Sequence, residues 1–539
     1  MQDLNDQRPV NGEEPPIYET ITPGLRAFLT MIVMVGAFMA ILDTTVVDVV
    51  VPKMMGPLAT DLYGIQWVIT AYMTAAAVGL LLTHSLSRVL GLKRLFLIGM
   101  VIFTSASALC GLAGSLAEMI GSRIVQGFGE SFIMASAQTI LFSIYPPKKK
   151  GLAMGIYAMG VSFAPSLGPT VGGWITEHLS WRWVFYINLP VGLLNFVAAS
   201  FFLPMVVRHR QPLRFNFVSY ALIGSFTISL LVLLSKGQQL GWGQSTFIVI
   251  LSFTAAICLL LYVLSELFSE HKLIDPAIFR NREYTLAMGF YFTTMGLSIY
   301  QLFFMLPLYY ETLKGLTTFQ TGLHMLAFAI FIAIVSPMAG IMSDRFGPRP
   351  VLVASAIIYL CTSYFLIPSL NYYTPSVRAA VLTIPLGISL GAFFAPVSAL
   401  ALGKLGDKTA QGVSLMHYLR FLGGSLGTAI ATNHLEERQA LHFENISLLQ
   451  NPGYIKPWLH QQAADLSRFF PPGVAETKAY ILLGTAQQVQ ARSFAFQDAF
   501  RNGFIFAVIG VGFLALLILD SRKRNKQRQA QPGMDSENR

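Results

Sequence analysis

The sequence predicts an all-α polytopic membrane protein with fourteen transmembrane helices. Of the 539 side chains, 54% are apolar and only 12% are charged, about half the charged fraction of roughly 25% in an ordinary soluble protein. The apolar residues form continuous runs rather than alternating patterns, which favours helices of roughly 20 residues over an outer-membrane barrel. A formal charge of +10 would suit a protein that binds nucleic acid, but the basic residues lie in short clusters between apolar runs. That pattern orients helices in a membrane, and we expect no nucleic-acid partner.

The sequence contains fourteen apolar runs, each delimited by charged and turn residues, and each run predicts one transmembrane span. In chain order the predicted spans lie near 26–50, 63–86, 94–114, 117–143, 151–175, 183–206, 216–236, 245–267, 284–311, 320–342, 349–369, 376–403, 409–434 and 499–520. The fourth and thirteenth runs are the least apolar. The N-terminus is polar and acidic, so we expect no cleaved signal peptide and insertion directed by the first span.

The distribution of basic residues predicts that both termini are cytoplasmic. With the N-terminus inside, the inner loops and the two tails carry 24 of the 37 Lys and Arg residues, whereas the short outer loops carry 5. Short cytoplasmic loops are enriched in Lys and Arg, so this bias sets the orientation. An even number of spans brings the C-terminus back to the same side.

An internal repeat predicts how the spans are grouped. The inner loop at 84–91 (HSLSRVLG) has a counterpart eight spans later at 340–347 (GIMSDRFG). Two related six-helix bundles separated by two linking helices give this spacing, and repeated halves are typical of secondary transporters. The predicted domains are an N-terminal cytoplasmic tail (1–25), a first six-helix bundle (26–206) and two linking helices with their loops (207–283). A second six-helix bundle (284–520) and a basic cytoplasmic tail (521–539) follow.

One outer segment, 435–498, is too long for a simple turn. Helix-like stretches within it are interrupted by Pro452, Pro457, Pro471 and Pro472. We consider two interpretations of this periplasmic loop. It forms either a cap over the outer mouth or a docking surface for an extracytoplasmic partner.

The second copy of the repeated loop is a candidate cytoplasmic gate. Its Gly-x-x-x-Asp-Arg-x-Gly-x-Arg pattern comprises Gly340, Asp344, Arg345, Gly347 and Arg349. The glycines permit close packing and a sharp turn, the acid can accept from a helix N-terminus or an arginine, and the arginines can pair with carboxylates or helix C-termini. The alternative is an ordinary positive-inside anchor. The first copy has Arg88 in place of the acid and His84 in place of the first glycine.

Small residues recur along the fifth span. The spacing of four residues places one set on a single face, which lets two helices approach closely in lipid. Two prolines add bend points. Such a helix suits an interface between moving bundles, although ordinary helix packing explains the pattern equally well. The residues of this motif are Gly160, Ala164, Pro165, Gly168, Pro169, Gly172 and Gly173.

Ionisable residues inside spans are costly, by roughly 3 kcal/mol on insertion scales, and are functional candidates. Asp43 lies 17 residues beyond Arg26, about 25 Å along the first span. Arg123 lies in the outer half of the descending fourth span, so the two can share a depth and pair. Glu130 is seven residues beyond Arg123, on the same face and near the midplane, where it can bind a proton or substrate. We predict a proton-coupling role for Asp43, Arg123 and Glu130.

Four segments resemble one known family. The residues 42–52 (LDTTVVDVVVP), 123–129 (RIVQGFG), 168–173 (GPTVGG) and 181–190 (WRWVFYINLP) are similar to the first-, fourth- and fifth-helix motifs and a further typical stretch of fourteen-spanner drug/proton antiporters of the major facilitator superfamily. The likeness extends from about residue 25 to 520.

This resemblance implies the major facilitator fold, a proton-coupling role for Arg123 and an antiporter motif in the fifth helix. It also implies a bacterial inner-membrane pump that works with a periplasmic adaptor and an outer-membrane channel. The chain departs from the family pattern at Asp48, where Asn is usual, and at Glu130, where a small residue is usual. Asp48, Gln126 and Arg420 are the candidate substrate-binding residues, because they place polar groups within the spans.

We therefore predict a proton-coupled exporter of lipophilic or amphiphilic small molecules. The proton gradient is its energy source, and we expect no cofactor, no metal site and no enzymatic activity. No phosphate-binding Gly-rich loop and no His-Glu-x-x-His or Gly-x-Ser-x-Gly motif stands out in the sequence. The three cysteines lie in apolar stretches without paired spacing. Three alternatives remain: a dedicated exporter of one metabolite, such as a siderophore or lipid; an importer, which the antiporter motif of the fifth helix disfavours; and a non-transporting sensor or assembly subunit.

Overall fold

The computed structural model describes residues 17–205, 215–448 and 452–530, and no β-strand occurs among them. Predictions that fall on 1–16, 206–214 and 531–539 lie outside the described residues; they concern most of the N-terminal tail, a basic inner loop and the end of the C-terminal tail. Helices cover nearly all the rest, as the all-α prediction requires.

Twelve helical segments among the described residues are long and apolar enough to cross a membrane. They are Pro23–Asp48, Trp67–Leu90, Leu92–Leu112, Pro147–His178, Trp183–Phe202, Phe217–Lys236, Thr246–Phe268, Arg282–Leu313, Thr318–Phe346, Pro348–Ser369, Ser376–Leu402 and Pro472–Ser521. Each coincides with a predicted span. The chain is therefore a multi-pass membrane protein.

The other two predicted spans coincide with α6 (Leu116–Ile144) and α18 (Thr409–Leu448), which are 29 and 40 residues long. Both helices form, but their polar residues keep them below the apolarity of the other twelve. These polar side chains are mostly buried inside the protein, so they are not exposed to lipid. The total of fourteen spans stays a prediction.

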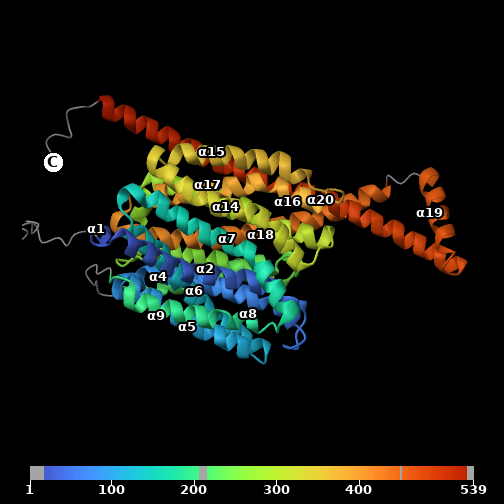
Figure 1. The fold of residues 1–539 in the computed structure, drawn as a ribbon, viewed down its shortest axis with the longest axis horizontal. Coiled ribbons are helices and arrows are strands. Elements are labelled where there is room, and N and C mark those ends of the chain that lie inside the picture. The colour runs from blue at the N-terminus through green and yellow to red at the C-terminus, as the bar shows by residue number, and fades with distance from the viewer. Residues whose placement is uncertain (1–16, 206–214, 449–451, 531–539) are drawn as a thin grey trace, which may run out of the picture.

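The helices are grouped around two seams (Figure 1). At one seam α7 packs against α14 and α17, and at the other α18 packs against α4 and α6. The helices named so far, and those that complete the spans, have these bounds: α2 Pro23–Met54, α4 Trp67–Leu90, α5 Leu92–Leu112, α7 Lys150–His178, α8 Trp183–Tyr186, α9 Asn188–Phe202, α10 Phe217–Lys236, α11 Thr246–Phe268, α12 Arg282–Tyr291, α13 Tyr300–Leu308, α14 Thr318–Phe346, α15 Pro348–Cys361, α16 Ser376–Leu382, α17 Ile384–Leu402, α19 Pro452–Leu466 and α20 Pro472–Ala530. The predicted domain boundaries stay a prediction.

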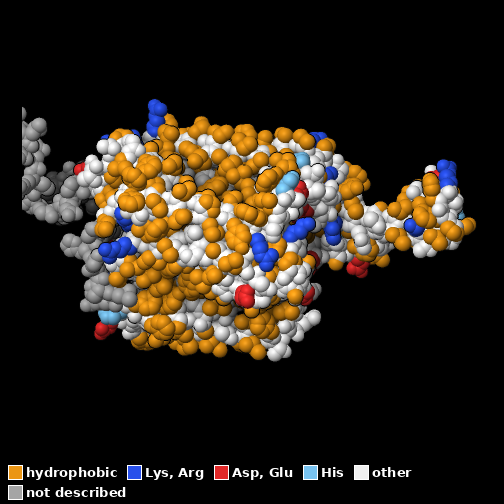
Figure 2. Space-filling model, turned by 60° about the horizontal axis from the view of Figure 1, so that its bottom comes forward, with side chains coloured by type: hydrophobic (Ala, Val, Ile, Leu, Met, Phe, Trp, Pro, Cys, Tyr) orange, Lys and Arg blue, Asp and Glu red, His pale blue; other side chains and the backbone are white. Residues whose placement is uncertain are grey.

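The two linking helices have different surroundings. α10 packs against both α4 and α18, so it spans the second seam, and Thr227 on α10 hydrogen-bonds Tyr418 on α18 at 2.7 Å. α11 packs on α10 and exposes large apolar side chains such as Phe253 and Leu260. Figure 2 shows the same character over the body, where hydrophobic side chains cover most of the visible face. This is the surface expected of a protein that faces lipid.

The repeated inner loops share one backbone conformation. Gly91 separates α4 from α5 with φ +79° and ψ 157°, and Gly347 separates α14 from α15 with φ +87° and ψ 156°. A positive φ is readily adopted only by glycine. The two loops predicted to be repeats therefore make the same turn, although most of their other residues differ.

The long segment between the last two predicted spans is a helical arm rather than a cap. α18 continues to Leu448, α19 covers Pro452–Leu466, and α20 begins at Pro472 and continues without a break to Ala530. In Figure 1 the arm projects away from the body along its long axis, with α19 at the far end. The described chain ends, at α1 (Ile17–Thr20) and at the end of α20, both lie at the end of the molecule opposite the arm, apart from each other (Figure 1).

Candidate functional site

The predicted pair of Asp43 and Arg123 forms in the first bundle. Asp43 on α2 and Arg123 on α6 are 2% and 1% exposed, and Nη1 of Arg123 lies 2.6 Å from Oδ2 of Asp43. The shared depth inferred from their positions along two antiparallel spans is thus confirmed. Since neither charge reaches water, each depends on the other for compensation.

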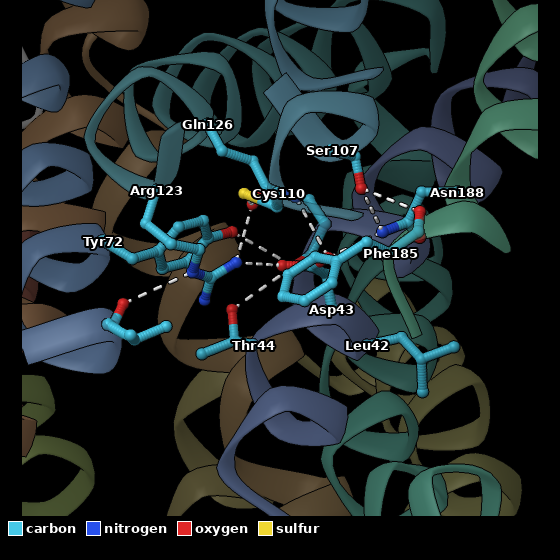
Figure 3. Close-up of polar contacts among 12 residues, drawn as sticks. Leu42, Asp43, Thr44, Tyr72, Ser107, Cys110, Arg123, Gln126, Phe185 and Asn188 are labelled. Carbon is cyan, nitrogen blue, oxygen red and sulfur yellow. Dashed lines mark hydrogen bonds and ion pairs between the residues drawn. The ribbon is translucent and has the colours of Figure 1, made fainter. Parts of the chain in front are cut away.

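Three more helices complete this polar cluster (Figure 3). Asp43 Oδ1 accepts hydrogen bonds from the side-chain amides of Gln126 (3.0 Å) and Asn188 (2.6 Å). Asn188 on α9 also donates to Ser107 on α5 at 3.0 Å. The Arg123 guanidinium lies 3.8 Å from the ring centroid of Tyr72 on α4, a cation–π contact. The cluster therefore joins five helices around one carboxylate.

Asn188 and Ser107 were not among the predicted site residues. Asn188 lies in the 181–190 stretch that supports the family resemblance, so its segment was noted but its side chain had no assigned role. Gln126 was predicted to bind substrate. It donates to Asp43 and its Oε1 accepts from Arg123 at 2.7 Å, which places it within the cluster; its role with substrate stays a prediction.

Glu130 lies two helical turns beyond Arg123 on α6, and its side chain is 2% exposed. Its Oε2 accepts no hydrogen bond from the described residues. The sequence suggested Arg123 as its cationic neighbour, but the charge that acts on it most strongly is that of Arg420, with Tyr72, Asp43 and Arg123 also close by. Arg420 comes from α18, so the acid of one bundle faces the cation of the other.

Other buried groups surround Arg420. Its Nε and Nδ1 of His417 have no hydrogen-bond partner among the described residues. The hydroxyl of Tyr157 on α7 lies 3.3 Å from Nε2 of His417, which forms a polar contact between the two bundles. Asp48, the third candidate for substrate binding, is exposed near the end of the first span. Neither Asp48 nor Gln126 belongs to the group around Arg420.

The small residues of α7 contact two different helices. A Cβ added at Gly160, Gly168 or Gly172 would meet Met34, Thr45 or Val46 of α2, whereas one added at Gly173 would meet Phe319 of α14. Ala164 and Pro169 are buried and Pro165 is half-buried, and α7 remains one continuous helix through both prolines. The predicted four-residue stripe thus mainly packs inside the first bundle.

The predicted gate joins the bundles at the inner ends of α7 and α14. Oδ1 and Oδ2 of Asp344 accept hydrogen bonds from the backbone N–H groups of Gly151 (2.7 Å) and Leu152 (2.8 Å). Asp344 therefore caps the N-terminus of α7, where the helix dipole favours a negative charge. Gly340 lies against the backbone of Gly151, and no side chain fits between the two.

The arginines of the gate are placed differently. Arg345 is exposed, with its guanidinium 5.3 Å from the ring centroid of Phe346. Arg349 lies 3.1 Å from Glu283, which also accepts from Lys404 at 2.9 Å. Glu283 was not predicted, yet it joins three inner segments of the second bundle.

A further ion pair lies at the same end of the second bundle. Lys408 hydrogen-bonds Asp275 at 2.5 Å and lowers the pKa of that carboxyl. Among the described residues, no group of three His, Cys, Asp or Glu side chains is arranged to hold a metal ion.

Comparisons with known proteins agree with this architecture. The family model of the Major Facilitator Superfamily matches residues 33–428. The multidrug export protein EmrB of Haemophilus influenzae is 29% identical over 94% of this chain and 98% of its own length. The fatty acid resistance protein FarB of Neisseria gonorrhoeae is 29% identical over 91% and 96%, respectively. The crystal structure of the human organic anion transporter MFSD10 is similar in fold, with a TM-score of 0.56, 14% identity and coverage of 90% of this chain and all of that chain.

Proposed function

Because the chain belongs to the Major Facilitator Superfamily, we propose that it is a proton-coupled exporter that moves lipophilic or amphiphilic compounds outward by alternating access. Relatives named for multidrug export and fatty acid resistance support an export function. The observation that carries the proposal is Glu130, a buried acid of the first bundle. Its Oε2 has no partner among the residues that the structure describes, and the side chain faces Arg420 of the second bundle.

In this mechanism Glu130 is the site that binds the proton. Its Oε2 accepts no hydrogen bond from the part of the chain that the structure describes, whereas both oxygens of Asp43 accept hydrogen bonds. Protonation of Glu130 removes the charge that compensates Arg420 across the seam, which changes the relative free energy of the inward- and outward-facing arrangements. The Asp43–Arg123 pair holds α6 in place so that Glu130 stays at the seam.

The cytoplasmic gate, in which Asp344 of α14 caps the N-terminus of α7, controls access from the cytoplasm in this mechanism. Asp344 and the N-terminus of α7 separate when the bundles rock apart at their inner ends, and they reassemble when that side closes. Charge-assisted hydrogen bonds to a helix terminus suit this role, because they are specific and yet can be replaced by water.

We further propose that the protein resides in a bacterial inner membrane with both termini in the cytoplasm. The bias of Lys and Arg toward the predicted inner loops supports this orientation. The arm then extends into the periplasm, where its projection from the body suits contact with a periplasmic adaptor that leads to an outer-membrane channel.

Flux measurements in proteoliposomes test the exporter. With an imposed proton gradient, the wild-type protein is expected to transport the neutral lipophilic dye Nile red, and Glu130→Gln is expected to abolish the gradient-dependent part. Asp43→Asn is expected to reduce it strongly. Glu118→Gln is the matched control, because Glu118 lies at the exposed start of the same helix. The proposed proton coupling would be overturned if wild-type dye flux were the same with and without the proton gradient. It would also be overturned if the gradient increased flux through Glu130→Gln as much as through the wild-type protein.

A further inference from the structure

The seam between α6 and α18 contains an acid and a cation whose hydrogen-bonding capacity is only partly used among the described residues. Glu130 Oε2 and Arg420 Nε are buried, and both are without partners among the described residues. An unsatisfied buried polar group is destabilising, and more so when it is charged. Two such groups of opposite charge, held on different bundles, indicate that a ligand supplies the missing partners in another state of the transport cycle.

Close helix packing holds Arg420 at this position. Three residues after it, Gly423 lies against the backbone of Gly296 in a π-helical turn of the second bundle, Phe292–Ile299. A side chain at either glycine would push the helices apart. Because α18 is held so closely, the backbone that carries Arg420 is fixed relative to the rest of the second bundle, which reduces the cost of binding a ligand there.

Aromatic residues form the apolar part of the same region. Tyr157, Tyr291 and Tyr300 lie near Arg420, whose guanidinium is 5.3 Å from the ring centroid of Phe421. Tyr157 stacks on Phe394 with ring centroids 5.9 Å apart. Aromatic rings offer a large apolar surface with a polar edge. The region therefore suits a ligand with a hydrophobic body and charged groups at one end.

The balance of charge selects among such ligands. Glu130 and Arg420 compensate each other, so a bound monocation or monoanion adds an uncompensated charge to a low-dielectric centre. A monoanion could be compensated by protonating Glu130, but proton and substrate would then bind together, which opposes antiport. A zwitterion adds no net charge, and its cationic end competes with the proton for Glu130.

We propose that the seam recognises zwitterionic amphiphiles, whose carboxylate binds Arg420 and whose ammonium group binds Glu130. This proposal rests on the proposed exporter function and specifies its substrate class. The ligand bridges the two bundles, because each of its charges binds a different one. Proton binding at Glu130 displaces the ammonium group and weakens the bridge.

Three fluorescent probes with one apolar body test the proposal. Dansyl-lysine carries both the carboxylate and the amine, dansylcadaverine lacks the carboxylate, and 6-(dansylamino)hexanoic acid lacks the amine. Binding to the full-length protein in lipid nanodiscs is followed by dansyl fluorescence. We expect the wild-type protein to bind dansyl-lysine at least tenfold more tightly than either of the other two.

Single charge removals are expected to change this preference in opposite directions. Arg420→Gln leaves Glu130 uncompensated, so dansylcadaverine becomes the preferred probe. Glu130→Gln leaves Arg420 uncompensated, so 6-(dansylamino)hexanoic acid becomes preferred. A misfolded protein cannot produce opposite preferences in two variants. Arg468→Gln, at an exposed position on the arm, is the matched control and is expected to keep the wild-type order.

Two results would overturn the substrate class. One is a wild-type protein that binds dansylcadaverine or the acid as tightly as dansyl-lysine. The other is a change of preference in the same direction in both variants. If either occurs while Nile red still moves with the proton gradient, the exporter stands and only the substrate class fails. If no gradient-dependent flux of Nile red or dansyl-lysine occurs, the proposed function itself fails.

Discussion

At the scale of single residues, the two buried acids of the first bundle differ in how many partners they have. Asp43 accepts from Arg123, Gln126 and Asn188, whereas Oε2 of Glu130 accepts from none of the described residues. A carboxylate stabilised by several donors holds its charge. We therefore assign Asp43 to the architecture of α6 and Glu130 to the exchange of protons.

The Asp43–Arg123 pair gives a prediction on stability. Asp43→Asn or Arg123→Gln leaves one buried charge without its partner, and each is expected to cost about 3–5 kcal/mol. The double variant removes both charges and is expected to be more stable than the sum of the two single effects implies. Thermal unfolding of the detergent-solubilised variants measures this as changes in Tm. Additive losses would show that the two charges do not depend on each other.

The sequence predicted this pair but not the partner of Glu130. The position of a residue along a span predicts its depth in the membrane, and the similar depths of Asp43 and Arg123 were enough to predict that they pair. Depth does not tell which helix of the other bundle lies opposite, so Arg123, on the same helix, was taken as the neighbour of Glu130 in place of Arg420. Glu283 was missed for the same reason, because Arg349 and Lys404 reach it from distant segments.

At the scale of helices, α7 shows what residue spacing can and cannot predict. Its glycines and alanine predict close packing, and close packing is found. Gly160, Gly168 and Gly172 face α2 in the same bundle, however, and the contacts to α14 include Gly151 and Gly155 near the inner end and Gly173 near the outer end. A stripe of small residues predicts that a helix approaches a neighbour closely, but it does not identify the neighbour.

The contact of α7 with α14 gives a prediction on conformation. A Cβ at Gly340 would clash with the backbone of Gly151 and Leu152, so Gly340→Ala is expected to force the inner ends of the two helices apart. A cost of about 1.4 kcal/mol to the closed arrangement would raise the inward-open population about tenfold relative to the closed one. Spin labels at the inner ends of α7 and α14 report this as a longer interhelical distance.

The control for this experiment is Gly121→Ala on α6, where a Cβ would meet nothing within 4 Å. It is expected to keep the wild-type distance distribution. If Gly340→Ala also keeps that distribution, the inner ends of α7 and α14 do not form the gate.

At the scale of the whole molecule, hydropathy predicted the positions of the long apolar helices but not their surroundings. α6 and α18 are the least apolar of the predicted spans because their polar residues lie inside the protein, in the Asp43 cluster and at the seam between the bundles, rather than in lipid. The prolines between 435 and 498 predicted the break between α19 and α20 at Pro471–Pro472 correctly, whereas Pro457 lies within α19. The break predicted at Pro452 lies next to residues outside the described part of the chain and stays a prediction. No local signal determines whether such a segment folds back or projects, and the cap interpretation is wrong.

The projecting arm gives the last prediction, which separates transport from assembly. Tyr454 on α19 and Phe469 just after it are 79% and 81% exposed, far from the seam between the bundles. Exposed aromatic residues at the tip of a projection suit a protein contact. Tyr454→Ser together with Phe469→Ser is therefore expected to leave proton-driven flux in proteoliposomes unchanged, because no adaptor takes part there. In intact cells with a complete envelope the same variant is expected to export the dye several-fold more slowly. A variant that loses flux equally in both settings would place the arm in the transport cycle, and one that loses it in neither would remove these side chains from any partner contact.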